Sequence, residues 1–394
     1  MIIVHDPLRH QASAAGPDVA TAAHQRDLPG LDGLRAIAVV LVILSHAVGD
    51  FASGNALRPV AVHGAFGVTI FFVLSGYLIT YLLLREEDRM GGIDLGRFLA
   101  RRAIRIAPPA FVLVATLMVL AWRGRFTLEP EVLASLLLFY RNLVSGPWVT
   151  GHLWSLAVEE HFYLAWPLVF VACRSPKWRA SCIALAVMAA PIWRAVVIRH
   201  AGGAWAVNGQ RTDLTCDAIL MGCLLALATR LPSWERCLSS RILRHPAASC
   251  LAIAVLIGTF TATFDAIPKS GGVSVTLRSL CVAIVINQVV RAPGGLLTRF
   301  LSLAALAWLG RLSYSVYLWQ QLFCSPAWPP SESRFLHLPW NLAPIMATAM
   351  LSYYVVEKPL FRLRARFRPV RSRRGSMIVS RPATASVYKS TYGV

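Results

Sequence analysis

The chain has 394 residues, of which 56% are hydrophobic and 15% are charged, and its formal net charge is +20 at pH 7. A soluble domain has about 25% charged residues, so this composition excludes an ordinary soluble protein and indicates a membrane protein. The arginines flank the apolar runs, which argues against nucleic acid as the partner and is typical of loops on the cytoplasmic side of a membrane.

Ten segments of the chain are long and apolar enough to be candidate membrane-spanning helices. Their apolar runs extend over about 16 to 22 residues, whereas the strands of an outer-membrane barrel alternate in polarity over about ten residues. We therefore predict an all-α, polytopic membrane helix bundle with about ten transmembrane helices. In chain order, the candidates are 34–51, 64–84, 106–122, 153–173, 180–198, 214–229, 246–264, 274–290, 301–323 and 340–361.

A single membrane domain is predicted between two polar ends. Residues 1–28 are predicted to be a cytoplasmic N-terminal extension, 29–362 the membrane domain, and 363–394 a basic, disordered cytoplasmic tail. With the N-terminus in the cytoplasm, arginine-rich stretches such as 85–105 also lie inside. The chain is therefore predicted to cross the inner (plasma) membrane several times, with both termini cytoplasmic. The apolar segment 132–140 is too short to span and is interpreted as a re-entrant or interfacial piece.

Two polar residues interrupt the first candidate helix, in the stretch "LDGLRAIAVVLVILSHA". Arg35 and His46 are eleven residues apart, which is about 1100° of helical rotation and about 16 Å of rise, so they share one helix face. A charge in the middle of the bilayer costs at least about 2.5 to 3.5 kcal/mol and needs a partner, an aqueous cavity or a task. In the structural interpretation, His46 packs against a neighbouring helix and Arg35 reaches the headgroups. In the functional one, both side chains face a channel between helices.

A basic pair precedes the third candidate helix, in "RRAIRIAPP", residues 101–109. Arg102 and Arg105 are spaced i, i+3 and therefore lie side by side at the cytoplasmic end of the helix, which Pro108 and Pro109 are expected to end or kink. Paired guanidinium groups suit phosphate oxygens, so a pyrophosphate or a nucleotide could bind there. Alternatively, the pair only anchors the helix on the cytoplasmic side.

Two adjacent carboxylates lie near the start of the fourth candidate helix, in "GHLWSLAVEEHFYLAWPL". Glu159 and Glu160 closely follow Trp154 and Ser155, and helical geometry directs neighbouring side chains about 100° apart. One carboxylate is therefore expected to point into the bundle while the other reaches the outer interface. The alternative is that both are solvated at a helix N-terminus, which favours negative charge.

Smaller groups of polar residues occur in the remaining helices, and ion pairs between helices explain most of them without chemistry. The eight cysteines have neither CxxC spacing nor a nearby histidine pair, so they are interpreted as core residues and no metal site is predicted. The polar groups are Arg194, Asp213 with Asp217, Arg278, Arg311 with Tyr314 and Tyr317, and Glu357 with Lys358.

Taken together, these stretches resemble the acyltransferase family 3 membrane proteins, whose members O-acylate sugars and related acceptors. The resemblance extends over about residues 29–362 and depends on six motifs that occur in the family's order. The chain departs from the family at His161, where glutamine is frequent, and at Gln320, where histidine is common. The motifs are Arg35 and His46 with ten residues between them, "GVTIFFVLSGYLIT" at 67–80, Arg102 and Arg105 with two residues between them, Trp154 to Glu159, "LGRLSYSVYLWQQ" and "VVEKPL".

The resemblance implies an integral-membrane O-acyltransferase. Acyl-CoA, with acetyl-CoA as the expected donor, would bind from the cytoplasm with its phosphates near Arg102 and Arg105, and no resident cofactor is expected. Histidine is the only side chain whose ordinary pKa lies near neutrality, so His46 is the expected general base or acyl carrier. The expected catalytic residues are His46, Glu159 and Arg35, and the expected substrate-binding residues are Glu160, Trp154, Ser155, Asp213, Arg311 and Tyr314.

The acceptor stays open at this point. A sugar hydroxyl of a surface polysaccharide, a lipopolysaccharide or a glycolipid is the first interpretation, and a glycosylated small molecule such as a macrolide is the second. Outside the enzyme class, the alternative is a transporter of a lipid-linked sugar, because charges inside the membrane also mark transport routes. The sequence shows no inverted repeat to support that alternative. The expected partners are therefore acyl-CoA, a carbohydrate acceptor and membrane lipid.

Overall fold

The computed structural model describes residues 29–47, 63–64, 66–200, 210–260, 271–324 and 338–364. These residues form helices joined by turns and loops, and no strand occurs among them. The all-α prediction is therefore confirmed for the described part of the chain. The predicted extension 1–28 lies outside the described residues, and so does the predicted tail apart from its first two residues, which continue the last helix.

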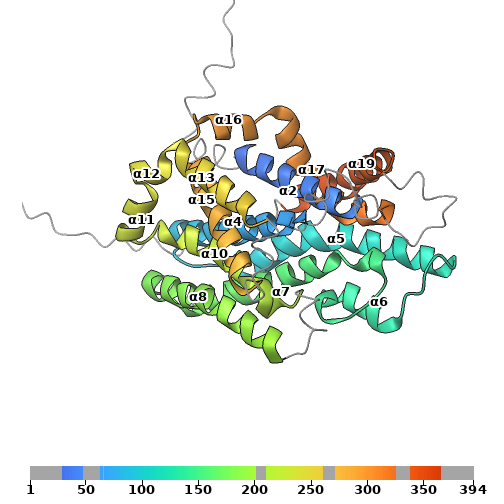
Figure 1. Cartoon of the computed structure of the whole chain (residues 1–394). Coiled ribbons are helices and arrows are strands. Elements are labelled where there is room, and N and C mark those ends of the chain that lie inside the picture. The colour runs from blue at the N-terminus through green and yellow to red at the C-terminus, as the bar shows by residue number, and fades with distance from the viewer. Residues whose placement is uncertain are drawn as a thin grey trace, which may run out of the picture.

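Four helices make the centre of the bundle: α2 (Pro29–Ala47), α4 (Phe66–Met90), α10 (Thr212–Ala228) and α17 (Ala304–Gln320). The packing between α4 and α10 and between α2 and α17 is the most extensive in the molecule. In Figure 1, α11 and α13 lie on one side of this centre, and α5, α6 and α19 lie on the other.

Glycines allow the central helices to approach closely. A Cβ atom added at Gly76 of α4 would lie 1.9 Å from the carbonyl oxygen of Ile219, and one added at Gly310 of α17 would lie 1.9 Å from the carbonyl oxygen of Asp32. No larger side chain fits at either place without moving the backbone. Small residues at helix crossings are the usual way in which helices associate tightly in a membrane.

The helix α5 (Leu95–Trp122) differs from its prediction. It begins eleven residues before the predicted segment 106–122, with the Asp94 side chain accepting a hydrogen bond from the backbone N–H of Arg97 as its N-cap. Pro108 and Pro109 lie inside the helix and do not end it, so of the two expected outcomes, an end or a kink, the end is contradicted. Arg102 and Arg105 are consequently part of the helix itself.

Each of the ten predicted segments contains helix, but the count of ten crossings is not confirmed. Within the described residues, five helices are long and apolar enough to cross a membrane: α2, α4, α5, α8 and α15. The pair α10 and α11 would be a sixth, although the two are bent by 105°. The remaining elements are α6 (Pro130–Leu137), η1 (Arg141–Leu143), η2 (Trp148–Thr150), α7 (Leu153–Ala172), α8 (Pro176–His200), α11 (Pro232–Leu238), α12 (Arg241–Arg244), α13 (Pro246–Gly258), α15 (Gly271–Arg291), α16 (Leu296–Leu301), η3 (Gln321–Phe323), α19 (Leu342–Leu351), the π-helical turn η5 (Ser352–Glu357) and α20 (Lys358–Arg364).

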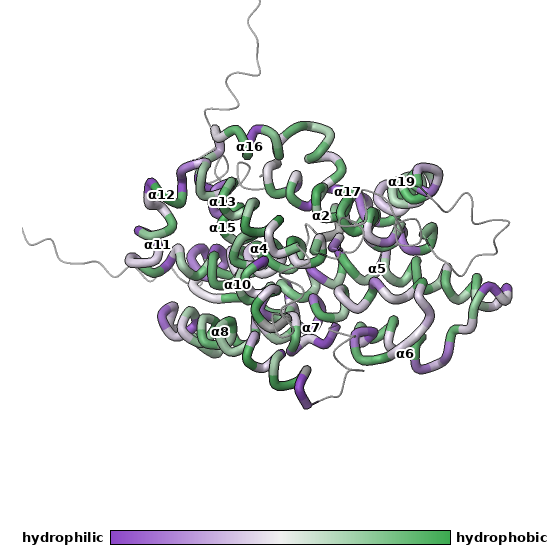
Figure 2. The backbone as a smooth tube through the Cα atoms, in the orientation of Figure 1, coloured by the Kyte–Doolittle hydropathy of each residue, from purple (hydrophilic) through white to green (hydrophobic). Residues whose placement is uncertain are grey.

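Hydropathy follows the helix bodies in the way that a membrane protein requires. Figure 2 shows hydrophobic residues along most of α8, α10 and α13, whereas hydrophilic residues gather at helix ends and connections. The predicted re-entrant segment 132–140 contains the eight-residue helix α6, which is far shorter than a membrane span.

Three consecutive acidic residues at the end of α4 tie four helical segments together. We call Glu86, Glu87 and Asp88 the acidic collar. Each of them forms an ion pair with an arginine from a different segment, so this end of α4 is fixed in position. The pairs are Arg101 with Glu86 at 2.6 Å, Arg179 with Glu87 at 2.9 Å and Arg230 with Asp88 at 2.5 Å.

A second ion pair lies deep between α8, α10 and α15. Arg194 donates two hydrogen bonds to Asp217, at 2.9 and 2.8 Å, and the Asp217 side chain is 0% exposed. Thr276 of α15 donates a further hydrogen bond to Asp217 at 2.6 Å. Ion pairing between helices, the structural interpretation of these residues, therefore describes this site.

Candidate active site

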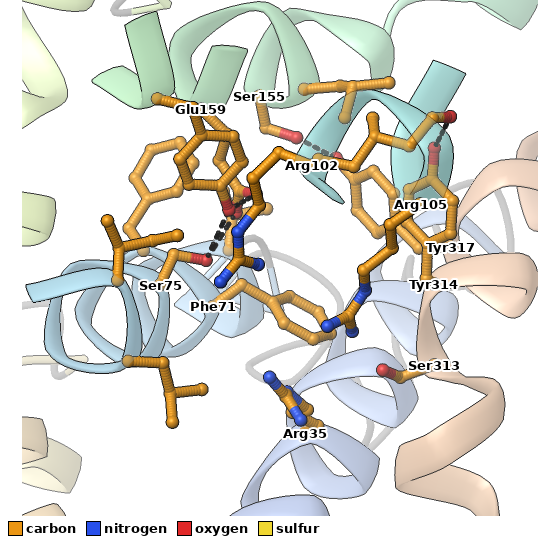
Figure 3. A pocket seen from close by; sticks show the side chains of 17 residues that line it. Arg35, Phe71, Ser75, Arg102, Arg105, Ser155, Glu159, Ser313, Tyr314 and Tyr317 are labelled. Carbon is orange, nitrogen blue, oxygen red and sulfur yellow. Dashed lines mark hydrogen bonds between the residues drawn. The ribbon is translucent and has the colours of Figure 1, made fainter. Parts of the chain in front are cut away.

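A cavity of about 100 Å³ lies between α2, α4, α5, α7 and α17. Figure 3 shows the side chains of Arg35, Arg102 and Arg105 converging on it. These arginines come from two helices, and hydroxyl groups and one carboxylate face them across the same space. The polar lining consists of Arg35, Ser75, Arg102, Arg105, Ser155, Glu159, Tyr163, Ser313, Tyr314 and Tyr317.

The three arginines have different surroundings. Arg35 forms an i, i+3 ion pair with Asp32 at 2.9 Å. The guanidinium of Arg102 lies over the rings of Phe98 and Tyr163, at 5.9 and 5.7 Å from their centroids. Among the residues that the structure describes, no carboxylate lies within ion-pair distance of Arg105. The arginine side of the cavity is therefore suited to an anion that comes from outside the protein.

Glu159 is the carboxylate of the cavity, and two hydroxyl groups hold it in place. Ser75 of α4 donates to one carboxylate oxygen at 3.1 Å, and Tyr163, one helical turn further along α7, donates to the other at 2.6 Å. Figure 3 shows these contacts as dashed lines. Ser75 lies in the motif at 67–80, but neither Ser75 nor Tyr163 was among the predicted site residues. The i, i+4 spacing of Glu159 and Tyr163 was a signal that could have identified the tyrosine.

Two tyrosines of α17 close the cavity on its other side. The Tyr314 hydroxyl donates to the carbonyl oxygen of Ile106 in α5 at 2.7 Å. The Tyr317 hydroxyl donates to the carbonyl oxygen of His152 at 2.8 Å and accepts a hydrogen bond from Ser155 at 2.5 Å. Ser155 and Tyr314, both predicted to bind substrate, therefore line the cavity together with Tyr317.

His46 does not line this cavity, although Arg35 on the same face of α2 does. The imidazole Nδ1 lies 3.0 Å from the side-chain oxygen of Gln320, and the ring of Trp148 meets the imidazole edge-on at 5.8 Å. The expectation of one channel containing both residues is therefore not met. The reason is distance, because about 16 Å of helical rise separates Arg35 from His46 even when both face the same way.

Tyr317 has contacts both in the cavity and near His46. We call His46, Trp148, His152 and Gln320 the His46 cluster. The ring of Tyr317 lies 5.5 Å from the His152 ring, and its hydroxyl bonds to the His152 backbone, while another part of the same residue lines the cavity. The cavity and the His46 cluster are therefore neighbouring sites that share contacts with Tyr317.

Four residues predicted to bind substrate lie elsewhere. Glu160 is outside the cavity lining, and one of its oxygens is buried with no hydrogen-bond partner among the described residues. Trp154 packs edge-on against Phe72, at 5.9 Å between ring centroids. Arg311 is exposed on α17. Of Glu159 and Glu160 only the first faces the cavity, as the divergence of adjacent helical side chains predicts, whereas the expected reach of the other to the outer interface stays a prediction.

Asp213, the fourth of them, lies in a separate, more open cleft of about 400 Å³. Arg211 pairs with it at 2.8 Å, and the indole of the half-exposed Trp193 donates to it at 2.8 Å. The other residues of this cleft are Leu143, His161 and Thr212. A charged pair beside an indole is a surface that can bind a polar molecule with apolar faces.

No group of three or more histidine, cysteine or acidic side chains in the described ranges is arranged to hold a metal ion. All eight cysteines are free thiols. The chemistry available at the two neighbouring sites is therefore that of imidazole, carboxylate, guanidinium and hydroxyl groups.

A family model and several curated relatives match this chain. The model of an acyltransferase domain, that of acyltransferase family 3, matches residues 28–356. A putative peptidoglycan O-acetyltransferase of Bacillus subtilis, YrhL, is 32% identical over 368 residues, which cover 86% of this chain and 55% of the relative. The peptidoglycan O-acetyltransferase OatA of Listeria monocytogenes is 27% identical over 372 residues, which cover 86% of this chain and 57% of the relative.

A third relative, the O-acetyltransferase OatA of Staphylococcus aureus, is 32% identical over 325 residues, which cover 75% of this chain and 50% of the relative. The chain thus spans about half the length of the curated relatives that it matches. No solved structure gives a significant match.

Proposed function

The chain belongs to acyltransferase family 3, and on that basis we propose that it is an integral-membrane O-acetyltransferase acting on a sugar hydroxyl of a cell-surface polysaccharide or glycolipid. The cavity carries this proposal, because it combines three arginines with a carboxylate that two hydroxyl groups hold in place. The names of the relatives, which are peptidoglycan O-acetyltransferases, favour an envelope glycan over a glycosylated small molecule as the acceptor.

The proposed orientation places both termini in the cytoplasm and the chain in the inner membrane. In that orientation the acidic collar and the ends of α2 and α5 that carry the cavity arginines face the cytoplasm. The arginine-rich connections fall on the same side, which supports this arrangement. The His46 cluster, at the opposite end of α2, then lies toward the outer face.

Acetyl-CoA is the proposed donor, entering from the cytoplasm. Its phosphate groups would bind Arg102, Arg105 and Arg35, and Arg105 is best suited because no described carboxylate competes for it. The cavity volume of about 100 Å³ is well below the roughly 300 to 1,000 Å³ of typical ligand sites. We therefore place the nucleotide at the mouth and only the narrow thioester arm inside.

The reaction then requires a proton acceptor for the sugar hydroxyl. The hydroxyl oxygen attacks the thioester carbonyl, an oxyanion forms, and the thiolate of coenzyme A leaves with the proton returned to it. His46 is the proposed base, or the carrier of the acetyl group in a two-step route. Glu159 and the cavity tyrosines would orient the thioester for attack at the His46 side of the cavity. Isolation of an acetyl-histidine adduct would select the two-step route.

The acceptor would approach from the outer face. The cleft at Asp213, with Arg211 and the indole of Trp193, is the proposed contact for the sugar there. Of the other predicted substrate-binding residues, Ser155 and Tyr314 keep that role at the cavity. Glu160, Trp154 and Arg311 have no contact with the cavity that would support it.

His46→Ala tests the proposed function. In purified protein, release of coenzyme A from acetyl-CoA that depends on a peptidoglycan fragment or another envelope saccharide is expected to fall by at least about 10²- to 10⁴-fold, because the base is lost. His200→Ala, at the exposed end of α8, is the matched control and is expected to keep both abundance and turnover. Equal loss of folded protein in the His46 variant would instead support a packing role.

The competing function is transport of a lipid-linked sugar. It predicts movement of such a lipid across vesicles that contain the purified protein, without consumption of acetyl-CoA. That result, with no acceptor-dependent release of coenzyme A, would contradict the enzymatic proposal.

A further inference from the structure

Gln320, the last residue of α17, is fully buried, with 0% of its surface exposed. Its side-chain oxygen lies 3.0 Å from Nδ1 of His46, from a position 274 residues away in the chain. We propose that Gln320 is a positioning residue that fixes the tautomer of His46, so that Nδ1 carries the proton and Nε2 is the atom free to act. This inference rests on the proposed function and adds a residue to it.

The chemistry of the contact defines the tautomer. An amide oxygen can only accept a hydrogen bond, so the His46 nitrogen facing it must be the one that carries hydrogen. The other nitrogen, Nε2, then has its lone pair available for a proton or an acetyl group. A histidine in the opposite tautomer would present an N–H to the substrate and could not serve as a base.

The surroundings keep both side chains in place. Gln321, the next residue, accepts a hydrogen bond from the backbone N–H of His152 at 3.1 Å and donates one to the carbonyl oxygen of Trp148. These bonds fasten the end of α17 to η2 and to the start of α7. Because Trp148 also meets the His46 ring edge-on, the imidazole is held from two directions.

Unused hydrogen-bonding atoms remain in the His46 cluster. The Gln320 amide nitrogen is buried and has no acceptor among the described residues, and Nδ1 of His152 is equally without a partner. The other nitrogen of His152 lies 3.0 Å from the carbonyl oxygen of Leu318, so it carries the hydrogen and leaves Nδ1 as an acceptor. Buried polar atoms without partners cost about 1 to 3 kcal/mol each. One of these atoms is a donor and the other an acceptor, so both kinds of hydrogen-bonding capacity remain unused in the His46 cluster.

The test is ¹⁵N NMR of the histidine side chains in the full-length protein, because the two tautomers give different nitrogen shifts. The His46 signals are identified by their loss in His46→Gln. In the wild type we expect a protonated Nδ1. Gln320→Met has a similar volume but no acceptor, so the Nδ1–H form should lose its dominance. Gln320→Glu keeps an oxygen at the same reach and should restore it.

Turnover gives the second measurement. Gln320→Met should lower kcat roughly 10- to 100-fold, because part of the base is in the wrong form, while the KM for acetyl-CoA changes less than about twofold, since the donor cavity is untouched. Gln320→Glu should recover most of kcat. A purely structural role predicts the reverse order, because a buried charge harms packing more than a methionine does.

Gln321→Met is the matched control, since it loosens the same end of α17 and the bond to Trp148 but keeps the Gln320 contact with His46 Nδ1. Its His46 nitrogen shifts should stay those of the wild type. Unchanged shifts in Gln320→Met would overturn the positioning role. If the tautomer changes in Gln320→Met but the wild type consumes no acetyl-CoA with any saccharide, the positioning role stands and the proposed function fails.

Discussion

Arg194 and Arg105 are both arginines within helices of the bundle, yet their surroundings differ completely. Arg194 lies between α8, α10 and α15, where Asp217 accepts two of its hydrogen bonds and Thr276 joins the group. Arg105 points into the cavity beside two other arginines, and no described carboxylate forms an ion pair with it. We call the first site closed, because its charges are paired, and the second open, because no described carboxylate forms an ion pair with Arg105.

The difference shows how to separate structural from functional charge in a membrane protein. A buried arginine that donates two hydrogen bonds to one carboxylate already has its counter-charge, so no further anion needs to bind. An arginine cluster without enough carboxylates needs an anion to complete it. In the sequence both cases look alike, as a cation within an apolar run, and only the partner distinguishes them.

The largest expected effect comes from removing the counter-charge at the closed site. Asp217→Ala leaves Arg194 buried without its partner, so the free energy of unfolding should fall by about 3 to 5 kcal/mol. Thermal unfolding of the detergent-solubilised protein, together with its yield in the membrane, measures this loss.

The control replaces both partners. Arg194→Met with Asp217→Leu removes the charges together, and stability should return to within about 1 to 2 kcal/mol of the wild type. If the double variant were as unstable as Asp217→Ala, the loss would come from packing and the contrast with Arg105 would be weaker.

At the open site the expected effect is on binding instead of folding. Arg105→Met should raise the KM for acetyl-CoA about 10- to 100-fold, because a charged hydrogen bond to phosphate contributes about 1.5 to 3 kcal/mol. The free energy of unfolding should change by less than about 1 kcal/mol, since no described carboxylate loses its partner. Steady-state kinetics and thermal unfolding on the same preparation measure both quantities.

Arg123→Met, at the opposite end of α5 and exposed, serves as the comparison for Arg105. It should change neither the KM nor the unfolding temperature. An Arg105 variant that loses stability as Asp217→Ala does, with an unchanged KM, would remove the distinction between the two sites.

The smallest effect is expected at the acidic collar. Asp88 and Arg230 form a close pair at 2.5 Å, but their side chains are 51% and 34% exposed, so solvent weakens the attraction. Asp88→Asn should therefore lower the free energy of unfolding by less than about 1 kcal/mol. Chemical unfolding at low and high salt tests this, because the effect should shrink further as salt increases.

The spacing of residues within single segments predicted where the helices lie and which side chains share a helix face. This is possible because the face on which a side chain lies follows from the geometry of its own helix. The ten candidate segments all contain helix, Arg102 and Arg105 line one cavity as their i, i+3 spacing requires, and Glu159 faces that cavity while Glu160 does not. These are properties of a single helix and need no knowledge of its neighbours.

Contacts between distant segments could not be predicted in the same way. Nothing in the sequence around His46 indicates Gln320, and nothing around Glu159 indicates Ser75, because these pairs form only when separate helices pack. The start of α5 at Leu95 was also missed, and of the two outcomes expected at Pro108 and Pro109, an end or a kink, the end did not occur. Neighbouring helices can supply the groups that a proline leaves unsatisfied in a membrane, so a proline there is weaker evidence for a helix end than in water.

Tyr317 has a consequence for the energetics of the cell. An enzyme that joins a cytoplasmic donor to an external acceptor risks becoming a leak through which protons dissipate the gradient that the membrane maintains. The phenol ring of Tyr317, fastened by Ser155 and His152, belongs to the cavity lining and also contacts the His46 cluster. It therefore fills space there that water and protons would otherwise occupy.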